Sequence, residues 1–88
     1  MIVLYALLLF DGVEGYIYSP QMSFFTLDSC TRFYEVYQDS VLNGILEYSK
    51  YSYGSYGIIK EAGCGYVSAN KELSPVAPLY IIDEGKTL

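Results

Sequence analysis

The chain has 88 residues, which is enough for one small domain spanning residues 1–88. Acidic residues outnumber basic ones by ten to five, so the formal net charge is −5, and there is no histidine. This composition excludes histidine-based acid–base catalysis and histidine-ligated metals. It also disfavours nucleic-acid binding, which needs clustered lysine and arginine. An apolar fraction of 52% with only 17% charged residues is typical of a chain that folds.

The first predicted element is a strand over residues 2–10, where every side chain is apolar. A run without alternating polar residues is typical of a strand covered on both faces, and it is too short to span a bilayer, which takes roughly 20 residues. The same run has the length of a signal-peptide core, with a permissible cleavage site near Gly15, but no lysine or arginine precedes it. We favour the strand, and cleavage of residues 1–15 stays open as the alternative.

A hairpin is predicted next, because Asp11-Gly12 is a strong signal for a type I′ turn. The returning strand covers residues 13–18 and places Tyr16 and Tyr18 on one face. Ser19-Pro20 then interrupts the pattern.

One amphipathic helix is predicted over residues 27–43, with Thr26 or Asp28 as its N-cap. Asn43-Gly44 is a plausible end, and the alternative is a helix that continues to about Lys50. Its apolar stripe, at spacings of three and four, consists of Leu27, Cys30, Tyr34, Tyr37 and Val41.

The last third of the chain predicts strands over 57–62 and 64–69, a loop over 69–78 with two prolines, and a short strand over 79–82. The glycines of Gly63-Cys64-Gly65 indicate a turn, a bulge or a close approach of another backbone segment. The expected fold is therefore α+β: a small antiparallel or mixed sheet of three to four strands, with one amphipathic helix packed on one face.

Residues 48–57 are rich in tyrosine, serine and glycine, a composition shared with antibody binding loops. One interpretation is an adhesive loop, and the other is a helix tail and loop whose rings cover the core. Under the first interpretation the candidate binding residues are Tyr48, Tyr51, Tyr53 and Tyr56, together with Tyr16 and Tyr18.

The two cysteines, Cys30 and Cys64, are either a disulfide pair or two buried thiols, and we favour the disulfide. Two cysteines without histidine do not make a zinc site, so no metal is expected. The carboxylate pairs Asp11/Glu14 and Asp83/Glu84 fall in a predicted turn and a predicted tail. No catalytic residue and no cofactor are expected, because no catalytic constellation is present.

A segment at the predicted helix start resembles one found in short uncharacterised proteins of tailed phages. There, an apolar strand is followed by a Phe-x-[Ser/Thr]-Leu-x-x-Cys-like helix start and a later second cysteine. The corresponding residues here are Phe24-Phe25-Thr26-Leu27-Asp28-Ser29-Cys30 and Cys64. The resemblance implies a viral origin and assigns no catalytic residue.

The sequence therefore predicts a non-enzymatic structural or interaction protein, a virion-associated subunit that decorates a phage capsid or attaches to a tail. Its partners would be other protein subunits in a homo- or hetero-oligomeric assembly, with no nucleic acid and no membrane span. The alternative is a secreted or periplasmic disulfide-stapled domain that binds through the tyrosine-rich loop. A third hypothesis is an acidic inhibitor of a host nucleic-acid enzyme.

Overall fold

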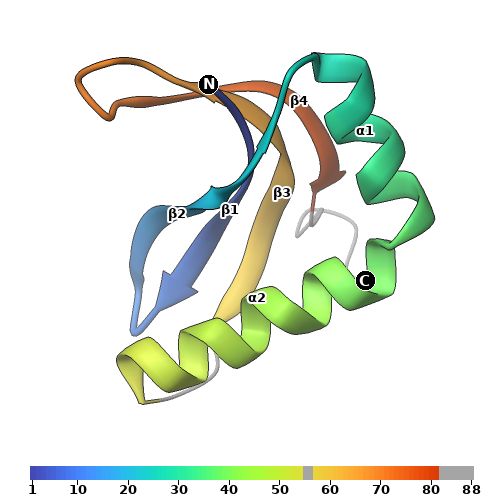
Figure 1. The fold of residues 1–88 in the computed structure, drawn as a ribbon. Helices are drawn as coiled ribbons and strands as arrows, with labels where there is room; N and C mark the ends of the chain where they lie inside the picture. Colours follow the sequence, from blue (N-terminus) through green and yellow to red (C-terminus); the bar gives the residue numbers. More distant parts are fainter. Residues whose placement is uncertain (55–56, 82–88) are drawn as a thin grey trace.

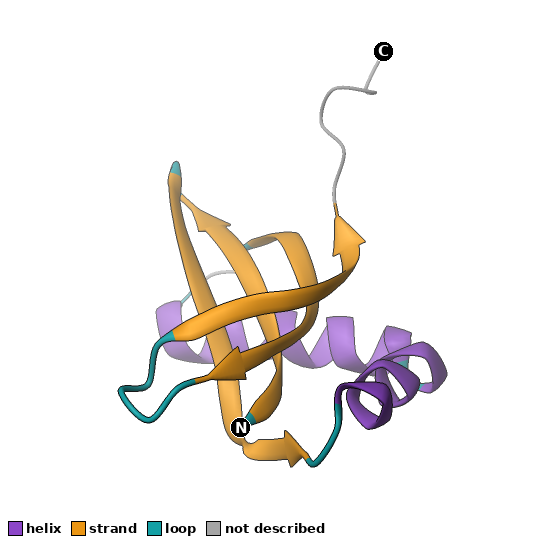
Figure 2. Cartoon of the chain, turned by 90° about the horizontal axis from the view of Figure 1, so that it is seen from above, coloured by secondary structure: helices purple, strands orange, loops and turns teal. Residues whose placement is uncertain are grey.

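A computed structural model describes residues 1–54 and 57–81. The described elements are β1 (Ile2–Phe10), β2 (Val13–Phe24), α1 (Leu27–Val36), α2 (Gln38–Tyr53), β3 (Ile58–Val67) and β4 (Leu73–Ile81). The strands form one antiparallel sheet in the order β2-β1-β3-β4, and both helices lie on the same side of it (Figures 1 and 2). The expected α+β class and the antiparallel sheet are confirmed, but two helices replace the single predicted one.

β1 lies inside the sheet and contributes to the core from both of its faces. Its even-numbered side chains point toward the helices, where they join two clusters. Val3 and Tyr5 point the other way, yet they are only 0% and 2% exposed. The buried residues of the two clusters are Leu4, Cys30, Tyr34 and Cys64 in the first, and Ala6, Leu8, Ile59 and Ala62 in the second. This double coverage explains why the run carries no polar residues.

The β1–β2 hairpin turns at Asp11 and Gly12, whose φ angles are 48° and 82°. Two consecutive positive φ values are the signature of the type I′ turn that the sequence predicts. β2 does not end at residue 18 as predicted but continues to Phe24. Its register with β1 shifts around Pro20, and the strand accommodates this proline because β2 is an edge strand with one unpaired side.

α1 begins where predicted, since the Thr26 hydroxyl oxygen accepts a hydrogen bond from the Ser29 N–H at 3.1 Å. The helix breaks at Tyr37, so the predicted continuous stripe is wrong and Tyr37 is half exposed. α1 packs on the cluster around Cys30, which Val41 of α2 also contacts, whereas other apolar side chains of α2 pack on the second cluster. The break lets the two helices follow different parts of a twisted sheet, which one straight helix would not cover.

α2 ends beyond both predicted positions, at Tyr53, and Gly54 caps it with a φ of 82°. Asn43 and Gly44 lie inside the helix on its exposed side. The Ser49 side chain is fully buried, and its oxygen accepts a hydrogen bond from the Gly57 N–H at 3.2 Å. This bond ties α2 to the start of β3.

β3 is one strand over Ile58–Val67 and not the two predicted strands separated by glycines. Its register with β4 shifts between Ala62 and Gly63 and again between Cys64 and Gly65, so the glycines mark irregular pairing inside the strand. β4 begins at Leu73, where a loop was predicted. Pro75 and Pro78 are tolerated there because β4 is the other edge of the sheet.

A disulfide joins α1 to β3, with Cys30 and Cys64 Sγ atoms 2.06 Å apart and both residues 0% exposed. The favoured pairing of the two cysteines is therefore confirmed. Neither helix among the described residues is long and apolar enough to cross a membrane.

Candidate interaction surface

The face of the sheet opposite the helices, called here the helix-free face, carries a small polar group at its centre. Tyr5 lies there with its ring centre 5.9 Å from that of Tyr16 on β2. Its hydroxyl donates a hydrogen bond to the Glu61 carboxylate on β3. Burial raises the pKa of Tyr5 above its ordinary value of 10.0, and the hydrogen bond and the charge of Glu61 raise it further. Tyr5 is therefore a neutral hydrogen-bond donor at neutral pH.

Lys60 and Glu14 form an ion pair between β3 and β2, with Nζ and Oε2 2.8 Å apart. The pair is possible because the register of β1 and β3 shifts between Leu7 and Leu8, at the level of Lys60. Glu14 is half exposed, so the contribution of this pair to stability is about 1 kcal/mol or less. Its more specific effect is to neutralise the carboxylate closest to the hairpin end of β2.

A hollow of about 400 Å³, called here the Gly15 hollow, surrounds the outer edge of β2. The space beside Gly15 is open, since a Cβ atom added to this residue would have no other atom within 4 Å. Tyr53 reaches the same hollow from α2, where its ring centre lies 4.8 Å from that of Phe10. The lining residues are Leu8, Phe10, Asp11, Val13, Glu14, Gly15, Tyr16, Ile17 and Tyr53.

The predicted binding tyrosines are divided among different parts of the surface. Tyr48, Tyr51 and Tyr53 are 52%, 91% and 54% exposed, and they belong to α2 and not to the predicted loop. Tyr16 and Tyr53 come together around the Gly15 hollow, whereas Tyr18 does not line it. Tyr56 lies outside the described residues. Sequence reasoning missed the hollow itself, because an isolated glycine within a strand pattern indicates a bulge or a close approach of backbone, whereas Gly15 has open space beside it.

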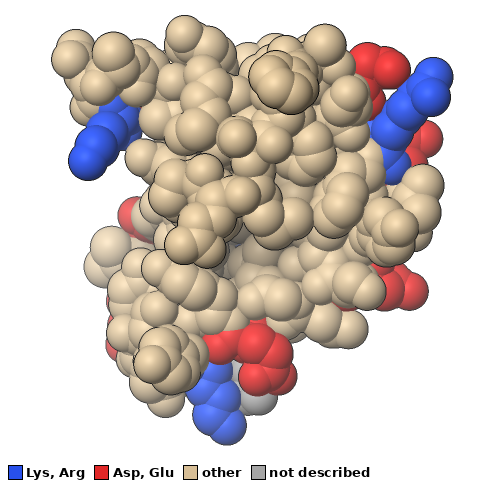
Figure 3. Space-filling view, in the orientation of Figure 1, with Lys and Arg blue, Asp and Glu red and all other residues tan. Residues whose placement is uncertain are grey.

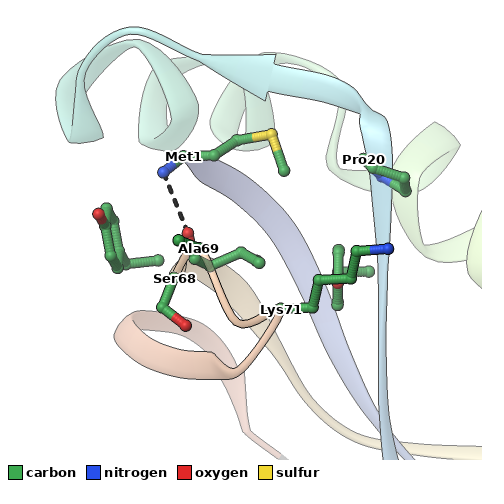
Figure 4. Close-up of a pocket in the computed structure, with 8 residues that line it drawn as sticks. Met1, Pro20, Ser68, Ala69 and Lys71 are labelled. Atoms are coloured by element: carbon green, nitrogen blue, oxygen red, sulfur yellow. Dashed lines mark hydrogen bonds between the residues drawn. The ribbon is translucent and has the colours of Figure 1, made fainter.

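Tyr18 lines a second hollow, of about 370 Å³, beside the β3–β4 turn (Figure 4). There the Met1 amino group donates a hydrogen bond to the Val67 carbonyl oxygen at 3.2 Å. Lys71 adds a cationic side chain at the mouth of this hollow, and its backbone has a φ of 64°. The arrangement offers two cationic groups, of which the Met1 amino group already donates to a backbone carbonyl, and mostly apolar walls, which is too little chemistry to select a ligand class.

The surface as a whole is rich in uncharged and aromatic side chains. Figure 3 shows one face on which charged residues lie toward the margins and uncharged atoms fill most of the view. Large apolar side chains that are at least half exposed include Val13, Tyr16, Phe25, Val36, Tyr51, Ile58, Tyr66, Val76 and Ile81. Contiguous patches of such side chains, where they occur, are typical of protein–protein contacts.

The paired titratable side chains of the described residues include Tyr5 with Glu61, Lys60 with Glu14, and Arg32 with Asp28 one helical turn away. Residues 1–54 and 57–81 contain no group of three or more histidine, cysteine or carboxylate side chains that could hold a metal ion. Asp11 and Glu14 lie at the hairpin end of β1–β2, and the other predicted carboxylate pair, Asp83 and Glu84, lies outside the described residues.

No family model, curated protein or solved structure matches this chain. The surface is therefore interpreted from its own geometry and chemistry.

Proposed function

We propose that this chain is a non-catalytic structural and interaction protein, a virion-associated subunit that decorates a phage capsid or attaches to a phage tail. The observation that carries the proposal is the large amount of exposed aromatic and aliphatic surface on so small a domain. A domain with few charges gains free energy when it buries such surface against neighbouring subunits.

The disulfide supports this role, because it holds α1 against β3 where the first core cluster lies. A small domain has a limited core, and a covalent cross-link between distant segments compensates for that. A rigid subunit also loses less conformational entropy when it joins an assembly.

The phage assignment rests on the resemblance of residues 24–30 to the helix start of short tailed-phage proteins. In the fold this segment comprises the end of β2, the Thr26 cap and the first turn of α1, which carries Cys30. The two cysteines of the resemblance are the two that form the disulfide.

A second candidate function is a secreted or periplasmic binding domain, favoured by the same disulfide, because disulfides persist in oxidising compartments. Its binding surface would be the exposed side of α2 with Tyr48 and Tyr51, since these tyrosines do not lie in a loop.

The test is to isolate the protein from its natural source without reductant and to measure, by sedimentation and native mass spectrometry, what it is bound to. The proposal expects this chain inside a large protein assembly that sediments as particles. A free monomer found apart from any particle contradicts it.

A matched pair of variants separates the second candidate from the first. Tyr51→Ser removes a side chain that is 91% exposed, so it should abolish ligand binding through α2 without affecting the fold. Val76→Ser changes an exposed residue on β4 instead and serves as the control. Loss of an extracellular ligand in Tyr51→Ser alone would favour the secreted domain.

A further inference from the structure

The outer edge of β2 presents unpaired backbone groups. β2 is a terminal strand, and β1 is its one neighbour among the described strands. In a two-residue hairpin the flanking residues, Phe10 and Val13 here, exchange their backbone hydrogen bonds, and pairing then alternates along the strands. Val13, Gly15 and Ile17 therefore point their N–H and C=O groups toward β1. Glu14, Tyr16 and Tyr18 point theirs outward.

The two edges of the sheet differ in how well they are protected against pairing. β4 carries Pro75 and Pro78, which cannot donate to another strand. The 13–18 segment of β2 has no proline and no lysine, and its Glu14 is neutralised by Lys60. An unprotected, mostly apolar edge is a template for strand addition. The β2 edge is thus the side on which a further strand fits.

We propose that the strand added here is β2 of a second copy of this chain, paired antiparallel about a two-fold axis at Tyr16. This inference rests on the proposed function, because it names one partner of an assembling subunit. The register places Tyr16 opposite Tyr16 of the second copy and Glu14 opposite Tyr18. It engages all three outward-pointing residues of both copies, with about six backbone hydrogen bonds.

The register also agrees with the chemistry of the side chains. A register centred on Glu14 would place two carboxylates opposite each other, which is unfavourable in a sheet. The register centred on Tyr16 places a tyrosine hydroxyl near each Glu14 and pairs two aromatic rings on the helix-free face. Pairing centred farther along β2 would bring in Pro20, which has no N–H to donate.

The Gly15 hollow supplies an independent fit. In the proposed register, Ile17 of the second copy lies opposite Gly15, on the side of β2 that faces the helices. Gly15 has open space where a side chain would be, and the hollow beside it is lined by Leu8, Phe10 and Tyr53. An isoleucine side chain matches such an apolar space, and the two-fold axis repeats the contact twice. The dimer would contain one continuous sheet made of both copies.

Cysteine cross-linking of the purified full-length chain tests the register. In Tyr16→Cys the two new thiols would sit on directly paired residues, about 5.5 Å apart between Cα atoms, which a disulfide can bridge. In the control Tyr18→Cys, the two equivalent residues would be roughly 13 Å apart along the strands, beyond the reach of a disulfide. The double variant Glu14→Cys/Tyr18→Cys again places a thiol opposite a thiol.

The expected result is a dimer mass for the unmodified protein and, after mild oxidation, covalent dimers of Tyr16→Cys and of the double variant but not of Tyr18→Cys. Tyr16→Pro should abolish the dimer, because it removes the central outward N–H, whereas Tyr16→Thr keeps that N–H and should still dimerise. An unmodified protein that is monomeric at about 100 µM, or equal cross-linking of Tyr16→Cys and Tyr18→Cys, overturns the inference.

The two proposals fail in different ways. A monomer in isolation that is still found in large particles from the natural source overturns the β2 pairing and leaves the structural role standing. A protein that is a dimer in isolation but is never found in a larger assembly supports the β2 pairing and overturns the structural role.

Discussion

Gly63 and Ala77 are in direct backbone contact: a Cβ atom added to Gly63 would lie 2.2 Å from the Ala77 carbonyl oxygen. β4 therefore runs beside β3 at a distance that only glycine permits at this position. The contact at Gly65 is less tight, since a Cβ atom there would lie 3.0 Å from the Ser74 carbonyl oxygen and 3.3 Å from the Tyr5 ring. The two glycines let the far edge of the sheet approach the helix-free side of Tyr5.

Replacing Gly63 by alanine should therefore destabilise the protein by about 1–3 kcal/mol, because the backbone of β4 must move away. The control is Gly15→Ala, where the added methyl group meets open space and the free energy of unfolding should hardly change. Urea unfolding of both variants at low protein concentration measures the difference. Equal stability of the two variants would contradict the close contact.

Tyr5→Phe should lower the free energy of unfolding by about 1.5–3 kcal/mol, because the lost hydrogen bond goes to a charged carboxylate. Glu61→Gln keeps an oxygen that can accept from the Tyr5 hydroxyl, so it should cost less. Chemical denaturation measures the free energy of unfolding of the two variants. A larger loss of stability in Glu61→Gln than in Tyr5→Phe would show that the carboxylate has another essential role.

Tyr34→Phe should have the opposite outcome to Tyr5→Phe. The Tyr34 hydroxyl is buried and has no hydrogen-bond partner among residues 1–54 and 57–81, although its ring packs in the cluster with the disulfide. Removing an unsatisfied hydroxyl while keeping the ring should leave stability unchanged or raise it by about 1 kcal/mol. Thermal and urea unfolding measure this, and a clear loss of stability would mean that the hydroxyl has a partner in solution.

The stability of the fold should decrease at alkaline pH. Burial raises the pKa of both Tyr5 and Tyr34 above the ordinary value of 10.0. Above about pH 10 the unfolded chain releases these protons while the folded chain retains them, so unfolding becomes more favourable as the pH rises. The stabilisation that the two protonated tyrosine hydroxyls contribute is complete below pH 10, and it is lost as the pH rises toward the folded-state pKa values. Urea unfolding at about pH 8 and pH 11 tests this, and Tyr5→Phe/Tyr34→Phe should show a smaller decrease.

Reduction of the Cys30–Cys64 disulfide should destabilise the protein by about 3–4 kcal/mol, because the bond closes a loop between residues 34 positions apart. Both cysteines are fully buried, so reduction in native buffer should be slow and should accelerate in urea. Cys30→Ala/Cys64→Ala measures the same loss without reductant. A double variant as stable as the parent would show that core packing alone holds α1 on the sheet.

Much of the fold could be predicted because local signals agree with the final packing. The apolar run of β1, the Asp11-Gly12 turn and the Thr26 cap each depend on neighbouring residues. The break at Tyr37 could not be predicted, because no proline or glycine marks it and the division of the core between two clusters arises only in the packed fold. Only the end of β4 was predicted, as a strand over 79–82, and its first part was assigned to a loop for a related reason: Pro75 and Pro78 argue against a strand unless it lies at an edge.

The candidate surface was less accessible to sequence reasoning than the fold. Tyrosine content indicates exposed aromatic surface, but it does not reveal that Tyr16 and Tyr53 meet around one hollow while Tyr51 lies elsewhere. That grouping depends on the return of α2 beside the hairpin end of β2. Composition left open whether these tyrosines belong to an adhesive loop or to a helix tail, because serine and glycine among them weaken a helix prediction. In the structure α2 continues to Tyr53, and Gly54 ends it.

The position of β1 has a consequence for biosynthesis. β1 is made well before one of its two neighbours, β3, which begins at Ile58. Until that strand leaves the ribosome, the most apolar segment of the chain has a single partner and an open side. Nascent chains in this state are prone to associate with other unfolded chains. We therefore expect the folding of this protein to depend on chaperones that shield residues 1–10 during translation. The yield of folded protein should rise when β1 and β3 are synthesised in quick succession.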